Sequence, residues 1–107
     1  MALAKQIMQD GQWYDAQKIA VAFREHFGPT AMARCAALAG RGKDRSAFEL
    51  IMIGARILAS ATLGTMAYEA LAEKRNGSHR MEYRWKPGAK NDKRNRISKR
   101  AQMSAQG

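Results

Sequence analysis

Apolar residues recur every three or four positions over most of the chain up to residue 74, which predicts a series of short helices. A weak repeat over residues 1–11 predicts an N-terminal extension. Asp15 is suited to cap the helix that follows, and Gly28 with Pro29 ends that helix. Its apolar stripe is Ala16, Ile19, Ala20, Phe23 and Phe27. A further helix is expected over residues 30–39, with Gly40 at its C-terminal end.

The strongest helix signal begins at Ser46, which forms a capping box with Glu49 and predicts a helix over residues 47–59. This segment is apolar on two faces, one of which holds Phe48, Ile51, Met52, Ala55, Leu58 and Ala59 and the other Leu50, Ile53 and Ile57. A helix that is apolar almost all round is central in a core or is shared with another chain. We therefore expect either a central helix or a homodimer contact through residues 47–59.

A turn over residues 60–64 and a fourth helix over residues 65–74 come next, with Thr65 as the expected N-cap. The apolar stripe of this helix is Met66, Ala67, Ala70 and Leu71. The alternative is that residues 60–62 simply continue the preceding helix. In that case one long helix runs to Lys74 and the chain has no helix-turn-helix.

A β-strand is predicted after Asn76 and Gly77, a pair that strongly favours a tight turn. Residues 80–85 alternate polar and apolar side chains, which is the pattern of a strand with one buried face. Its core-facing residues are expected to be Met81, Tyr83 and Trp85. Pro87 ends the strand, and the short extended segment at Trp13 and Tyr14 is expected to pair with it.

Three stretches, GQWYDAQKIA, ALAEKRNG and YRW, resemble in pattern the winged helix-turn-helix DNA-binding superfamily over residues 12–86. The resemblance implies a mainly α fold with a small C-terminal β-hairpin, in which residues 47–59 and 65–74 form the helix-turn-helix and Gly77 marks the tip of the wing. Residues 28–46 depart from this pattern because they add a helix and a glycine-rich loop. An all-α bundle with a terminal hairpin therefore remains the alternative fold.

Positive charge is concentrated near the C-terminus. Residues 1–73 hold eight Lys or Arg and seven Asp or Glu, a net charge of +1, whereas residues 74–100 hold eleven against two, a net charge of +9. This distribution predicts a polyanionic partner that approaches from one end. We expect a helical domain over residues 12–87 and a basic tail over residues 88–107 that has no core pattern and is disordered alone.

Nucleic acid is the expected partner, DNA rather than RNA, bound mainly through the wing and the tail. Glu69 and Glu73 would repel phosphates beside a recognition helix, so base reading by that helix is expected to contribute less. The candidate binding residues are Thr65 and Tyr68 on the helix, Arg75, Asn76, Arg80, Arg84 and Lys86 on the wing, and Lys90, Lys93, Arg94, Arg96, Lys99 and Arg100 on the tail. The small size favours a regulator or accessory factor of a phage or other mobile element.

Two alternatives remain open. One is a helical protein-interaction module or inhibitor, such as a phage anti-defence protein, whose basic end occupies a surface of a larger complex. The other is RNA binding through the tail, which resembles the arginine-rich RNA-binding segments of phage antitermination proteins.

Catalysis is not expected, because the two histidines are far apart in sequence and no His, Cys, Asp or Glu pair has metal-ligand spacing. We expect no cofactor and no metal. The single cysteine, Cys35, excludes an internal disulfide and favours the cytoplasm. No apolar run is expected to reach the roughly 18 residues of a membrane span, because Glu49 and Arg56 interrupt residues 47–61.

Overall fold

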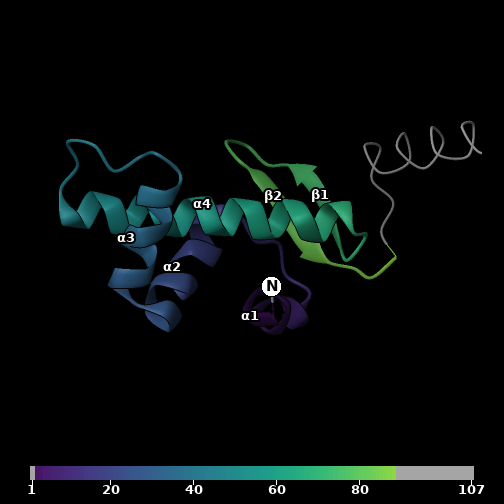
Figure 1. Cartoon of the computed structure of the whole chain (residues 1–107). Coiled ribbons are helices and arrows are strands. Elements are labelled where there is room, and N and C mark those ends of the chain that lie inside the picture. The colour runs from purple at the N-terminus through teal and green to yellow at the C-terminus, as the bar shows by residue number, and fades with distance from the viewer. Residues whose placement is uncertain (1, 89–107) are drawn as a thin grey trace, which may run out of the picture.

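A computed structural model describes residues 2–88 of the chain (Figure 1). It is mainly helical and ends in a two-stranded antiparallel hairpin, which confirms the general fold class expected from the sequence. The elements in chain order are α1 (Ala2–Ile7), the short 3-10 helix η1 (Met8–Asp10), α2 (Ala16–Phe27), α3 (Pro29–Leu38), α4 (Ala47–Tyr68), β1 (Ala72–Asn76) and β2 (Met81–Trp85).

The long helix α4 is the element around which the others pack. In Figure 1, α2 and α3 lie against one half of α4, whereas the hairpin lies along the other half. The largest fully buried side chains come from η1, α2, α3 and α4: Met8, Ile19, Phe23, Met32, Leu63 and Met66. A single core therefore joins the N-terminal extension, the helices and the hairpin.

The helix starts follow the capping signals in the sequence. The Asp15 side chain accepts a hydrogen bond from the Lys18 backbone N–H at 2.8 Å, and the Ser46 hydroxyl accepts one from the Glu49 N–H at 3.2 Å. Gly40 follows α3 in the left-handed conformation with φ 74°. The expected helices at 16–27 and 30–39 and the capping box before α4 are thus confirmed.

The expected helix-turn-helix over residues 47–74 is wrong, because α4 continues without a break for 22 residues. Its buried stripe passes straight through the expected turn, since Ala59, Leu63 and Met66 are all fully buried. The Thr62 hydroxyl donates to the Leu58 carbonyl oxygen at 2.8 Å, so this polar side chain is satisfied within the helix. Burial of the stripe outweighs the weak helix propensity of the Ser, Thr and Gly residues in this segment.

Helix α4 ends at Tyr68 rather than at Lys74, so the predicted helix over residues 65–74 is also wrong at its C-terminal end. Ala70 adopts the left-handed conformation, φ 60°, that glycine usually supplies after a helix. The Leu71 N–H donates to the Met66 carbonyl at 2.8 Å, and the Ala70 N–H donates to the Ala67 carbonyl at 3.2 Å. This is a Schellman motif, and it turns the chain into β1.

The hairpin extends into a minimal third strand at Tyr14. Tyr14 and Tyr83 exchange two backbone hydrogen bonds of 2.7 Å, which confirms the expected pairing of this segment with β2. The Tyr14 hydroxyl also donates to the Asp10 carboxylate at 2.5 Å, which lowers the pKa of Asp10 and raises that of Tyr14. Tyr83 and Trp85 pack against the core as expected, whereas Met81 is 40% exposed.

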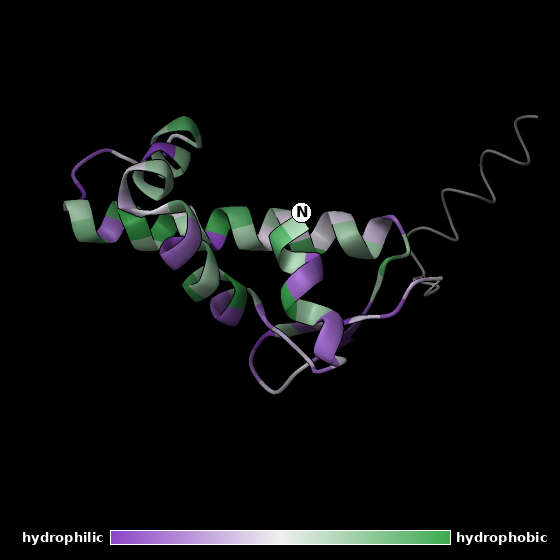
Figure 2. Cartoon of the chain, turned by 90° about the horizontal axis from the view of Figure 1, so that it is seen from below, coloured by the Kyte–Doolittle hydropathy of each residue, from purple (hydrophilic) through white to green (hydrophobic). Residues whose placement is uncertain are grey.

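The length of α4 corrects one further expectation. Within residues 2–88 it is the one helix whose length and composition would allow it to cross a membrane, with a mean hydropathy of 1.6. The hydrophobic residues are densest in its N-terminal half (Figure 2). Core helices of soluble proteins meet the same criterion, and α4 packs against α2, α3 and β1.

Replacing Gly54 by alanine should destabilise the fold, because a Cβ at Gly54 would overlap the Met32 backbone carbonyl of α3. Forcing α3 away from α4 is overpacking, for which we expect a loss of about 1–3 kcal/mol in the free energy of unfolding. Gly64→Ala is the matched control, because a Cβ there meets nothing within 4 Å. The control should gain about 0.5–1 kcal/mol. Urea unfolding measures both, and equal stability of the two variants would contradict the close crossing.

Candidate nucleic-acid interface

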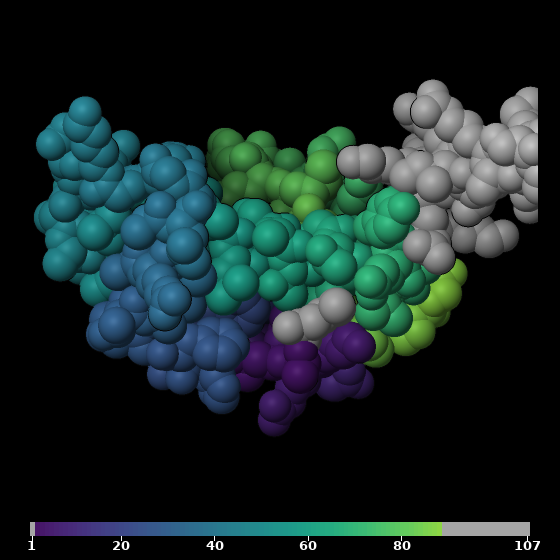
Figure 3. Space-filling model, viewed as in Figure 1, coloured from purple at the N-terminus to yellow at the C-terminus, as the bar shows by residue number. Residues whose placement is uncertain are grey.

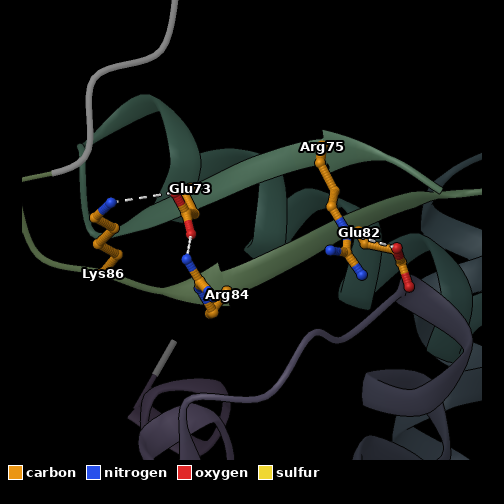
Figure 4. Close-up of polar contacts among 5 residues, drawn as sticks. All are labelled: Glu73, Arg75, Glu82, Arg84 and Lys86. Carbon is orange, nitrogen blue, oxygen red and sulfur yellow. Dashed lines mark hydrogen bonds and ion pairs between the residues drawn. The ribbon is translucent and has the colours of Figure 1, made fainter.

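The hairpin presents a charged face on the side away from the core. Side chains alternate across a strand, and the register pairs Glu73 with Arg84 and Arg75 with Glu82. These four side chains therefore share one face, with Lys86 just beyond β2 (Figure 4). Residues of the opposite parity, Ala72, Tyr83 and Trp85, pack on the core. We refer to Glu73, Arg75, Glu82, Arg84 and Lys86 as the charged face.

The cations of the charged face are held by carboxylates. Glu73 pairs with both Arg84 and Lys86, the Lys86 Nζ lying 3.5 Å away, and the Arg75 Nε lies 2.9 Å from Glu82 (Figure 4). Three positive and two negative charges leave this face at +1. The three cations are 37–58% exposed, whereas Glu73 and Glu82 are 23% and 27% exposed, so solvent screens these pairs only in part and each contributes on the order of 1 kcal/mol. The carboxylates orient the cations, but the interaction energy of each ion pair is small.

Trp13 adds an aromatic surface to the charged face. The guanidinium carbons of Arg75 and Arg84 lie 3.9 and 4.6 Å from the centroid of its ring. Cation–π contacts of this kind contribute about 0.5–1 kcal/mol at exposed sites. The sequence pattern predicted that Trp13 lies in a pairing strand, but it did not indicate that Trp13 belongs to the site. Its proximity to the arginines follows from the bridge between Tyr14 and Tyr83, which brings the N-terminal segment beside β2.

The tip of the hairpin is of mixed charge. Arg80 Nη1 lies 3.9 Å from an Asp15 carboxylate oxygen, a long ion pair. A hollow of about 410 Å³ at the tip is lined by Asp15, Gly77, Ser78, His79, Arg80 and Glu82. Two carboxylates in this lining make the hollow a poor phosphate site. The tip therefore contributes Arg80 and Asn76 as separate surface groups, both of them exposed.

Of the other predicted site residues, Thr65 and Tyr68 lie on the last two turns of α4 and are exposed. Thr65 lies within the helix, so its expected role as an N-cap is wrong. Both residues precede the hairpin directly in the chain. Six predicted residues of the tail, Lys90, Lys93, Arg94, Arg96, Lys99 and Arg100, lie outside the described residues.

Burial raises the pKa of the Tyr83 hydroxyl, which therefore stays neutral at physiological pH. Over residues 2–88, no group of three or more His, Cys, Asp or Glu side chains could hold a metal ion. What the described part of the site offers is a set of cations, an indole ring and polar donors.

Comparison with protein-family models, with curated protein sequences and with solved structures found no match to this chain. The resemblance to winged-helix proteins therefore rests on pattern alone, and function has to be argued from the chemistry of the site.

Proposed function

We propose that the chain is a small nucleic-acid-binding protein that binds duplex DNA through its basic C-terminal end. The observation that carries this proposal is the separation of charge, +9 over residues 74–100 against +1 over residues 1–73. The described part of the basic region is the hairpin, which lies along α4 with its charged face away from the core. A basic C-terminal segment that follows a nearly neutral fold favours a polyanionic partner.

The charged face suits a phosphate backbone because its ion pairs are exchangeable. A DNA phosphate that meets Arg84 or Arg75 replaces Glu73 or Glu82, whose ion pairs are partly screened by solvent. The guanidinium groups are already ordered by Trp13, so little conformational freedom is lost when a phosphate binds. The hairpin thus acts in the manner of a wing.

Residues 86–88, which lie between the hairpin and the basic tail in the sequence, are held at the C-terminal end of α4. The Lys86 N–H donates to the Leu71 carbonyl at 3.0 Å, and the Gly88 N–H donates to the Ala70 carbonyl at 2.7 Å. The chain is therefore anchored at the end of α4 before the lysines and arginines of residues 90–100 begin. In this proposal the hairpin, the tail and the exposed Thr65 and Tyr68 all contact the DNA.

This mode of binding differs from that of a winged helix with a separate recognition helix. Phosphate contacts by the hairpin and the tail supply most of the affinity, and Thr65 and Tyr68 are the candidates for base contacts. A small protein of this type suits a regulator or accessory factor of a phage or other mobile element, acting in the cytoplasm.

Self-association through the N-terminal end of α4 belongs to the same proposal. Helices α2 and α3 cover one side of α4, where Gly54, Ala55 and Ala59 are buried. Near the α3–α4 loop (residues 39–46), two large apolar side chains are open to solvent, since Leu38 is 78% and Phe48 69% exposed. Exposed apolar side chains of this size favour contact with a second copy.

Removing two cations of the charged face should weaken duplex binding. Arg75→Ala with Arg84→Ala deletes two phosphate contacts, so the log–log slope of affinity against salt should become less steep by about 1.8. Fluorescence polarisation with a random duplex at several salt concentrations measures the slope. Lys18→Ala with Arg34→Ala, exposed cations of α2 and α3, is the matched control. Equal effects of both pairs, or a preference for single-stranded RNA, would contradict the proposal.

Removing the competing carboxylates should strengthen binding. Glu73→Gln with Glu82→Gln frees the arginines and deletes two negative charges beside the phosphates, so duplex affinity at low salt should rise several-fold. The control is Glu25→Gln with Asp44→Asn, which changes the net charge equally at a distance from the hairpin. Asparagine tolerates the left-handed conformation of Asp44, φ 58°. A gain as large in the control would assign the effect to net charge instead of to the charged face.

Replacing Leu38 and Phe48 by serine should convert a dimer into a monomer. Both side chains are exposed within one copy, so the fold itself should remain intact. Analytical ultracentrifugation is expected to give twice 11.9 kDa for the natural sequence and 11.9 kDa for the double variant. Val21→Ser, at an apolar residue of α2 that is 37% exposed, is the control that should leave the mass unchanged. A natural sequence that sediments as a monomer would refute this contact.

A further inference from the structure

A groove runs along α4 between the α3–α4 loop and the tip of the hairpin. Both of these segments rise on the same edge of α4 in Figures 1 and 3. Two adjoining hollows form the groove and share Arg56 and Ser60. The first, about 390 Å³, is lined by Arg41, Ile53, Arg56, Ile57 and Ser60. The second, about 240 Å³, is lined by Ala16, Arg56, Ser60, Arg80, Met81 and Tyr83. We call these two hollows together the α4 groove.

The α4 groove is lined by positively charged side chains, and its own lining contains no carboxylate that would neutralise them. Arg41, Arg56 and Arg80 line it, and no carboxylate does. Asp15 reaches Arg80 at 3.9 Å, whereas Arg41 and Arg56 form no ion pair with any residue in the described part of the chain. This differs from the charged face, where each cation has a glutamate. Each cation of the groove therefore attracts an anionic ligand more strongly than a cation of the charged face does.

The floor of the α4 groove is apolar, which distinguishes the groove from a binding site for a phosphodiester backbone. Ile53 and Ile57 of α4 are only partly buried, and Met81 is 40% exposed. Covering such side chains with an apolar ligand removes them from water and is therefore favourable. A phosphodiester backbone gains nothing from this floor. The ligand that fits both features carries carboxylates and apolar side chains together.

The α4 groove and the charged face lie on opposite sides of the hairpin. Met81 and Tyr83 line the groove, whereas Glu82 and Arg84, at the alternate positions of the same strand, belong to the charged face. A ligand in the groove therefore leaves the charged face open. Arg80, before β2, is the one cation of the predicted wing that lines the groove.

We propose that the α4 groove binds an acidic amphipathic helix of a partner protein. The floor from Ile53 to Ser60 is about 10 Å long at 1.5 Å per residue. Apolar side chains at i, i+3 or i+4, and i+7 on a partner helix span the same length. These side chains cover Ile53, Ile57 and Met81, and the flanking carboxylates of the partner pair with Arg41, Arg56 and Arg80. Arg41, Arg56 and Arg80 come from the loop, from α4 and from the hairpin.

The test uses the full chain, labelled with ¹⁵N, and a synthetic helical peptide of about 15 residues with leucines at i, i+4 and i+7 and glutamates on the flanks. Amide signals of Arg41, Ile53, Arg56, Ile57 and Met81 are expected to shift on titration, while those of Arg75 and Arg84 stay in place. The analogue with lysines in place of glutamates is expected not to bind. Absence of shifts with the acidic peptide, or equal shifts with the lysine analogue, would overturn the proposal.

Charge reversal in the groove gives the matched comparison. Arg41→Glu with Arg56→Glu should lower the affinity for the acidic peptide more than tenfold, whereas Lys18→Glu with Arg34→Glu makes the same change in net charge elsewhere and should lower it much less. A single-stranded oligothymidylate is titrated in parallel. If the oligonucleotide shifts the groove signals and the peptide does not, the groove belongs to the nucleic-acid surface and the proposed protein partner is excluded. The outcome does not depend on whether the charged face binds duplex DNA.

Discussion

The close crossing of α3 over α4 at Gly54 determines where the surfaces of this protein lie. Gly54 is buried against the backbone of Met32, and no other residue type fits there without moving one of the helices. This contact holds α3 on one side of the N-terminal half of α4, while α2 covers another side through Ile19, Ala20 and Phe23. The edge of α4 that remains open carries Ile53, Arg56, Ile57 and Ser60, which become the floor of the α4 groove.

Sequence patterns predicted the features that depend on local chemistry. Asp15 and Ser46 were identifiable as caps because their side chains satisfy backbone donors within three residues. The pairing of Tyr14 with β2 also followed from a short extended segment and an alternating strand. The two ends of α4 differ in how well the sequence predicts them. Its capping box was readable, but its C-terminal end depends on Ala70 in a conformation that alanine rarely adopts, so the sequence contains no signal for it.

In the candidate sites too, features that depend on local sequence were predicted, whereas contacts between segments far apart in the sequence were not. The concentration of positive charge from residue 74 onward can be counted in the sequence, and the hairpin carries part of it. The pairing of Glu73 with Arg84 depends on strand register, and the position of Trp13 depends on a bridge between distant segments. The α4 groove could not be predicted from the sequence. Its arginines, Arg41, Arg56 and Arg80, belong to a loop, a helix and a hairpin that meet only in the folded chain.

The carboxylates of the charged face connect folding with function. A two-stranded hairpin is marginally stable by itself, and a row of unpaired arginines and lysines would repel one another. Oppositely charged residues placed directly across the strands each contribute roughly 0.2–1 kcal/mol. Glu73 and Glu82 occupy such positions, so they stabilise the hairpin in the absence of a ligand. Since the arginines of these pairs are partly exposed, a phosphate can take the place of each glutamate. The charges that stabilise the free hairpin are therefore the same ones that keep its arginines in position to bind.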